Sequence, residues 1–179
     1  MYAFKNEDLP HYTYEDYVQW EGRWELIHGV PYAMSPAPSM YHQDLNLNIL
    51  SELKSGLSKC KKCKAYMPVD WRISKETVIQ PDALVVCKPF EEGTYLSKTP
   101  SIIFEILSPT TSKKDQNLKY DIYEKEKVKY YIIVNPKSKK AAVHVLNNDE
   151  YALAGEFASG TFDFDIDACP FSFDFGKIW

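Results

Sequence analysis

The segment from Ile102 to Leu107 (IIFEIL) is an apolar run with a single acid, Glu105, inside it. A continuous apolar run bounded by polar residues is typical of a strand that is covered on both faces of its sheet. A carboxylate is rarely fully buried without a partner, because the loss of its hydration costs free energy. The segment therefore predicts a buried strand and requires a group that neutralises Glu105.

A second acid lies in another segment that is predicted to be a strand, Gln80–Val86 (QPDALVV). Strand alternation places Gln80 and Asp82 on one face, and it places Glu105 on one face of its own strand. If the two strands are neighbours, the two carboxylates converge and repel each other unless a cation lies between them. Mg²⁺ typically binds one or two carboxylates and keeps several waters. The pattern predicts a Mg²⁺ or Mn²⁺ site at Asp82 and Glu105.

A helix is predicted from about residue 113 to 127, directly after the Glu105 strand and a short break. Asp115, Lys119 and Tyr123 recur in it at a spacing of four, so they lie on one helical face. Lys119 is expected to reach back over the end of the strand. There its ammonium group would orient or activate a water and offset the charge on a pentavalent phosphate.

Each of these residues also has an ordinary structural interpretation. Asp82 follows a proline and is in a position to cap a turn. Glu105 is explained equally well as a core acid paired with a lysine, and Lys119 as a solvated helix lysine. The three residues taken together are more specific than any one of them, and the combination favours a metal-dependent phosphodiesterase site.

The spacing of these residues resembles a known nuclease motif. Pro81–Asp82 followed by Glu105–Leu107 (E-I-L) is similar to the PD-(D/E)XK superfamily, with Leu107 where the motif has lysine. One branch, the Uma-type restriction endonucleases, carries the lysine on the following helix, and the wider sequence resembles that branch from about Tyr12 to Leu146. The segments that carry the resemblance are WELIHGVPYAMSPAPS, VIQPDALVV and IIFEILSPTTSKKDQNLKYDIYEKEKVKYYIIVNP.

The resemblance implies an α/β (α+β) fold of the restriction-endonuclease type, in which helices flank a mixed, curved β-sheet, with residues 1–179 as a single nuclease domain. It implies Asp82 and Glu105 as catalytic metal ligands and Lys119 as the catalytic lysine. Glu25, Gln80, Asp115 and Tyr123 are expected at the edge of the site. The implied function is metal-dependent hydrolysis of DNA by a homodimer. His42, at the start of a helix predicted to end near Leu57, is expected to be a packing or capping residue.

The charge distribution leaves a second function open. The net charge of −4 does not favour a nucleic-acid partner, yet residues 113–140 carry nine lysines and residues 59–64 carry four. These segments are either ordinary solvated surface or a local patch that attracts phosphate. The alternative to a nuclease is a non-catalytic module for nucleic-acid binding or protein interaction that retains the nuclease fold.

The four cysteines give no clear pattern of their own. Cys60 and Cys63 form a C-x-x-C pair, but Cys87 and Cys169 stand alone, so the second ligand pair of a zinc site is missing from the sequence. Ordinary thiols are expected, with redox chemistry or a zinc-ribbon-like binding module at Cys60 and Cys63 as the less favoured alternatives. The sequence has no apolar run as long as a membrane span and no basic segment followed by an apolar one at its N-terminus. A cytoplasmic location without membrane association is therefore expected.

Overall fold

The computed structural model describes residues 10–34, 37–88, 90, 92–108, 115–167 and 169–179, with the backbone alone at residues 115 and 116. Its largest sheet is mixed and has the strand order β11–β10–β9–β8–β6–β3. The β8–β9 pair is parallel and the other four pairs are antiparallel. The strands are β3 (Cys63–Tyr66), β6 (Ala83–Cys87), β8 (Ile102–Ile106), β9 (Tyr130–Asn135), β10 (Lys140–Asn147) and β11 (Glu150–Phe157).

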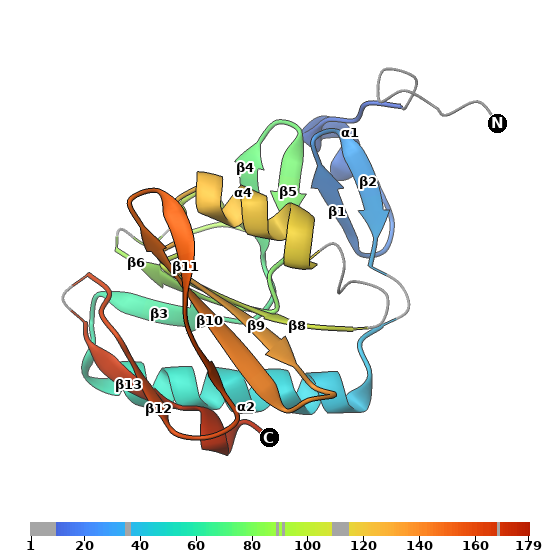
Figure 1. The fold of residues 1–179 in the computed structure, drawn as a ribbon. Helices are drawn as coiled ribbons and strands as arrows, with labels where there is room; N and C mark the ends of the chain where they lie inside the picture. Colours follow the sequence, from blue (N-terminus) through green and yellow to red (C-terminus); the bar gives the residue numbers. More distant parts are fainter. Residues whose placement is uncertain (1–9, 35–36, 89, 91, 109–114, 168) are drawn as a thin grey trace.

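Strand β8 lies inside this sheet, between β6 and β9, and all five of its residues are buried. Burial on both faces requires a layer on each side. Helix α2 (Met40–Gly56) covers one face and helix α4 (Tyr120–Lys125) lies against the other (Figure 1). The mixed α+β fold, with a long helix and a lysine-bearing helix on a mixed sheet, is confirmed.

The face that α2 covers holds the larger of two apolar clusters. Leu45, Ile49 and Leu53 recur along α2 at helical spacing and are fully buried. They share this cluster with Phe104 of β8 and with residues of the two-stranded sheet near the C-terminus. That region comprises β12 (Thr161–Phe164), β13 (Phe171–Asp174) and the 3₁₀ helix η4 (Phe175–Lys177), and another 3₁₀ helix, η2 (Leu57–Lys59), follows α2.

The opposite face carries α4 and a second sheet of order β2–β1–β5–β4–β7. Trp71 of this sheet stacks on Tyr123 of α4, with ring centroids 5.9 Å apart, so the two elements share one apolar cluster. The remaining elements are α1 (Tyr14–Tyr17), β1 (Trp24–Ile27), β2 (Val30–Ala33), β4 (Asp70–Ser74), β5 (Thr77–Ile79), β7 (Tyr95–Leu96) and the π-helical turn η3 (Asp115–Lys119).

Two features of the sheets do not follow from the hydrophobic pattern. The segment 65–73 (AYMPVDWRI) has the aromatic and branched residues of one strand, but it is divided between β3 and β4, which belong to different sheets. Pro68 lies at the break, where its missing N–H interrupts strand pairing. The hydrophobic pattern also placed no strand at β5, whose three residues, although all buried, are too few to establish an alternation.

The expectation of ordinary thiols is wrong for this structure. Cys60 is bonded to Cys169 and Cys63 to Cys87, which leaves none of the four cysteines free. Cys63 and Cys87 face each other across the β3–β6 pair, whereas Cys60 and Cys169 are 109 residues apart in the sequence.

Among the described residues, none of the helices has both the length and the hydropathy needed to cross a membrane.

His144 makes the stability of the fold dependent on pH. Its ring lies among those of Tyr120, Tyr131 and Tyr151, and burial lowers the pKa of the imidazole. The unfolded chain therefore binds a proton more readily than the folded protein, and the free energy of unfolding should fall as the pH drops through about 6.5. We expect His144→Phe to unfold with a shallower pH dependence between pH 8 and pH 5.5 in urea titrations. An unchanged slope would contradict this assignment.

Candidate active site

Glu105 is held by a lysine and a tyrosine that both come from the chain after β8. Its Oε1 accepts hydrogen bonds from Lys119 Nζ at 2.7 Å and from the Tyr123 hydroxyl at 2.6 Å. Lys119 Nζ also lies 3.0 Å from Oε1 of Glu25 in β1. The exposed fractions of Glu25, Glu105 and Lys119 are 0, 3 and 2%, so one ammonium group is shared by two buried carboxylates.

The local structure after β8 explains how Lys119 reaches Glu105. Lys119 is the last residue of η3, and Tyr123 follows one turn later on α4, so the spacing of four puts both on the face toward the sheet. The helix starts as a π-helical turn, a rare geometry that is frequent at functional sites. The expected grouping of Lys119 and Tyr123 is thus present. The side chain of Asp115, which was predicted on the same face, lies outside the described residues.

Tyr123 remains a hydrogen-bond donor over the whole physiological pH range. Burial is the main cause that raises the pKa of its hydroxyl well above the usual value, and the nearby negative charge of Glu105 raises it further. A protonated phenol donates its hydrogen to the carboxylate and adds no charge of its own. Tyr123 thus helps to fix the position of Glu105 without changing the charge balance of the cluster.

Glu25 connects this cluster to a second group of polar residues. Its Oε1 accepts a hydrogen bond from the backbone N–H of Gln80 at 3.0 Å. The side chain of Gln80 donates to Asp70 in β4 and accepts from Arg23 at 3.0 Å. The sequence pointed to Glu25 and Gln80 but gave no signal for Asp70 and Arg23, because these residues meet only through the pairing of β1, β5 and β4.

Asp82 lies in the connection between β5 and β6, directly before β6. The register pairs Ala83 with Phe104, so the next step of the same register puts Asp82 opposite Glu105. The Asp82 carboxylate itself is held by other groups: Oδ2 accepts from the backbone N–H of Ile106 at 2.8 Å and lies 3.3 Å from Nε2 of His42. Within the described part of the chain, Asp82 Oδ1 has no hydrogen-bond partner.

His42 has a larger part in the site than the sequence suggested. Its backbone N–H donates to Oγ of Ser39, the N-cap of α2, which agrees with a position at the start of the helix. Its ring, however, contacts the Asp82 carboxylate, and 13% of the side chain is exposed. No spacing rule connects residues 42 and 82, so only the packing of α2 beneath the sheet reveals the pair.

Among the described residues, no three ligand atoms of Glu25, His42, Asp82 and Glu105 lie within 4.8 Å of one another, so these side chains would have to turn to share a divalent cation. Lys119 contacts the carboxylates of Glu25 and Glu105, whereas the Asp82 carboxylate lies against His42. Asp82 Oδ1 has no partner among the described residues, and carboxylate oxygens are the ligands that Mg²⁺ and Mn²⁺ prefer. Glu105, by contrast, is turned toward Lys119 and Tyr123.

Comparison with known proteins identifies the family of this chain. Residues 14–162 match the Uma2 family model, which is described as "Putative restriction endonuclease". The chain belongs to this family. The match contains every element that supplies a side chain to the cluster, from β1 to α4. A comparison with curated proteins gave no match.

The fold of this Uma2 family member is shared with a solved structure. It is similar to a protein from Anabaena variabilis ATCC 29413 that is described as "a putative nuclease belonging to DUF820". The TM-score is 0.74 at 16% sequence identity, and the match covers 93% of this chain and 96% of the other. The two proteins thus share one fold, and the restriction-endonuclease-like architecture is confirmed.

The shared ammonium group of Lys119 is expected to stabilise the fold as well as the site. Lys119→Met leaves Glu25 and Glu105 buried without their cation and should lower the free energy of unfolding by about 3–5 kcal/mol. Adding Glu105→Gln to this variant should restore part of the loss, because one buried charge is then removed. Urea unfolding measures both effects.

Lys125 provides the matched control for this prediction, because it is an exposed lysine on the same helix. Lys125→Met should change the free energy of unfolding by less than about 0.5 kcal/mol. Equal stability of the Lys119→Met and Lys125→Met proteins would show that the buried cluster contributes nothing to the fold.

Proposed function

We propose that this protein is a metal-dependent endonuclease that hydrolyses phosphodiester bonds of DNA. The observation that carries the proposal is the position of Lys119, whose buried ammonium group is held by two carboxylates next to the strand pair that bears Asp82. A lysine that serves only solubility is exposed to water, whereas this one is 2% exposed. Membership of a family described as restriction endonucleases supports the same reaction class.

In the proposed reaction Asp82 and Glu105 would hold one Mg²⁺ or Mn²⁺ ion through their carboxylate oxygens. When bound, such an ion would polarise a phosphate oxygen and lower the pKa of a coordinated water. Lys119 orients the attacking water, and its positive charge offsets the charge that builds up on the phosphate. Asp82, Glu105 and Lys119 are the proposed catalytic residues.

The neighbouring residues hold these three groups in place. His42 and the backbone N–H of Ile106 position Asp82. Tyr123 positions Glu105, and Glu25, itself fixed by the backbone of Gln80, positions the Lys119 ammonium group. Preorganised charges of this kind need no rearrangement during the reaction, which is the usual source of a large rate enhancement.

The proposal also covers the substrate, the oligomeric state and the location of the protein. Lysines of the segments 59–64 and 113–140 provide positive charge that attracts a polyanion to a protein whose overall charge is −4. A DNA duplex presents two strands for cleavage, so we propose a homodimer that brings one site to each strand. We propose a cytoplasmic location, where such a substrate is available.

The first test is metal-dependent nicking of supercoiled plasmid DNA. We expect activity with Mg²⁺ or Mn²⁺ and none after chelation by EDTA. Asp82→Asn, Glu105→Gln and Lys119→Gln should each lower the nicking rate by at least about 100-fold. Asp121→Asn and Lys125→Gln, on exposed positions of α4, should leave the rate within about twofold of the unchanged protein.

Folding is checked for each variant by circular dichroism, because the buried cluster also supports stability. Binding of DNA without cleavage by the folded protein, under any divalent metal, would favour the non-catalytic binding module instead. Cleavage of RNA but not of DNA would contradict the proposed substrate. Nicking that persists in all three site variants would overturn the proposed site.

A second test addresses His42, which is proposed to position Asp82 without touching the substrate. His42→Asn should raise the metal concentration that gives half-maximal nicking by about tenfold, because Asp82 loses its partner. The rate at saturating metal should change less than this. His11→Asn is the matched control, since His11 lies 3.1 Å from Glu76 in an exposed histidine–carboxylate pair. Equal metal dependence of the two variants would contradict the positioning role.

A further inference from the structure

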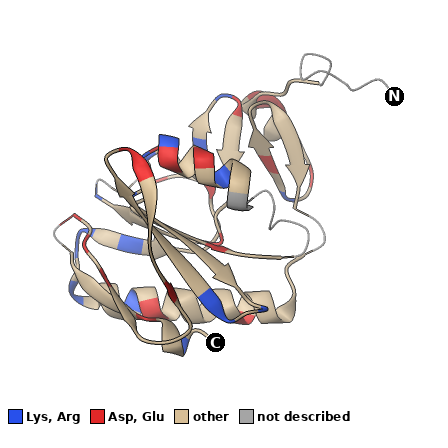
Figure 2. Cartoon of the chain, viewed as in Figure 1, with Lys and Arg blue, Asp and Glu red and all other residues tan. Residues whose placement is uncertain are grey.

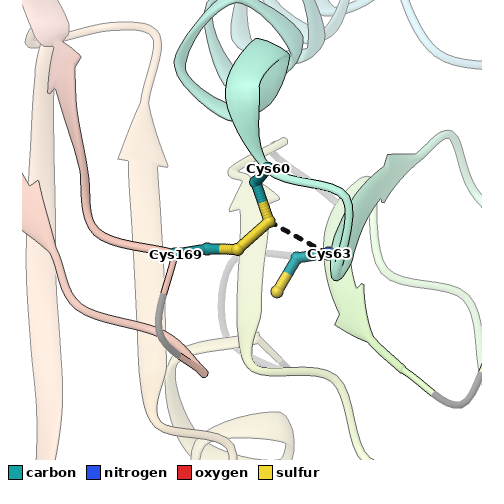
Figure 3. A group of neighbouring side chains, drawn as sticks. All are labelled: Cys60, Cys63 and Cys169. Carbon is teal, nitrogen blue, oxygen red and sulfur yellow. Dashed lines mark hydrogen bonds between the residues drawn. A yellow bond between two sulfur atoms is a disulfide. The ribbon is translucent and has the colours of Figure 1, made fainter.

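The four cysteines converge at the end of α2 that lies away from His42. Cys60 follows η2, Cys63 begins β3, Cys87 ends β6, and Cys169 lies shortly before β13. The sulfur atoms of Cys60, Cys63 and Cys169 all lie within 4.8 Å of one another (Figure 3). The sulfur of Cys87 joins this group through its bond to Cys63. The two disulfides therefore lie together, and the four residues are called the cysteine cluster below.

The hydrogen bonds that the sulfur atoms accept indicate that the cysteine cluster is suited to thiolates. The backbone N–H groups of Lys62 and Cys63 both donate to Cys60 Sγ, at 3.3 and 3.2 Å. The hydroxyl of Ser101 lies 3.6 Å from Cys87 Sγ and donates to it. Such donors stabilise negative charge on sulfur and commonly surround metal-bound cysteines. A disulfide sulfur is uncharged and gains much less from them.

The positive charge around the cysteine cluster and the burial of its sulfurs also suit thiolates. Lys59, Lys61, Lys62 and Lys64 flank the C-x-x-C pair, with no acid between residues 59 and 64. Figure 2 shows basic positions on β3 and close to the end of α2 that precedes β3. A divalent ion with four thiolates carries a net charge of −2, which these lysines offset. Cys63, Cys87 and Cys169 are at most 8% exposed, so water has little access to three of the sulfurs.

We propose that Cys60, Cys63, Cys87 and Cys169 bind one Zn²⁺ ion as four thiolates when they are reduced. The disulfide-bonded form is then the oxidised, metal-free state of the same site. A tetrahedral site with Zn–S bonds of about 2.3 Å places its sulfurs about 3.8 Å apart. The sulfurs of Cys60, Cys63 and Cys169 lie within 4.8 Å of one another and need only small side-chain adjustments. Cys87 is bonded to Cys63 but lies outside this group of three, so its side chain has to move further.

The conversion between the two states balances with a dithiol as the reductant. Each protein disulfide takes two electrons and two protons from one dithiol, which becomes a disulfide itself. The four cysteine thiols then lose their protons to solvent as they bind Zn²⁺, because the metal ligand is the thiolate. A reducing compartment such as the cytoplasm favours the thiol state, and therefore the zinc form.

Cys87 is assigned as the fourth ligand in preference to Asp167. The carboxylate of Asp167 also lies within 4.8 Å of the sulfurs of Cys63 and Cys87. Asp167 is exposed, however, whereas Cys87 is buried and already directed at Cys63 across the strand pair. Structural zinc sites are closed by four protein ligands and most often by thiolates and imidazoles. The site would join α2, β3, β6 and the C-terminal strands.

The test measures zinc bound to the full-length protein after reduction with a phosphine and removal of loosely bound metal. We expect one equivalent of Zn²⁺ per chain, released by a thiol-blocking mercurial. With Co²⁺ in its place, we expect the strong visible bands of a tetrahedral ion and thiolate charge-transfer bands in the near ultraviolet. Folded, fully reduced protein that binds no zinc would overturn the proposal.

Variants separate this site from its alternatives. Each single Cys→Ser change should weaken zinc binding by at least about 100-fold and reduce the Co²⁺ charge-transfer intensity. Asp167→Asn should change neither, and the opposite result, with Cys87→Ser silent, would overturn the four-cysteine assignment. Asp82→Asn, in the proposed catalytic site, should keep its equivalent of zinc. Loss of zinc in that variant would place the metal in the other site and refute this one.

Discussion

The structure depends on a single buried charge arrangement, the ammonium group of Lys119 between the carboxylates of Glu25 and Glu105. Two buried acids without a cation would repel each other and oppose folding, and a buried lysine without an acid would be equally unfavourable. The cluster therefore requires β1, β8 and the η3–α4 segment to assemble together. In the folded protein these three elements fix each of the charged atoms, which is the condition for electrostatic catalysis.

Glu105 belongs to this cluster because β8 is an inner strand of the sheet. Its apolar neighbours fill the cores on both faces, which leaves the acid buried. The antiparallel register with β6 brings Asp82 opposite Glu105, and α2 places His42 beneath it. The site thus combines side chains of α2, β1, β8 and the η3–α4 segment with Asp82, which precedes β6.

Helix α2 connects this site with the cysteine cluster. His42 lies in its first turn, and Cys60 follows its C-terminal end, so a rigid helix of 17 residues separates the two groups. Either pairing of the cysteines, by disulfides or by zinc, ties the C-terminal strands to the core layer under β8. The apolar core, the charged cluster and the cysteine cluster therefore stabilise different parts of the same layered arrangement.

The sequence by itself determined features that rest on local periodicity. The apolar run of β8 fixed a buried strand, the spacing of four placed Lys119 and Tyr123 on one helical face, and Glu105 demanded a partner. Only the tertiary structure decided which distant residues meet: Arg23 and Asp70 with Gln80, His42 with Asp82, and Cys87 and Cys169 with the C-x-x-C pair. Strand register and helix packing set these contacts. Both depend on the whole core, so no local pattern encodes them.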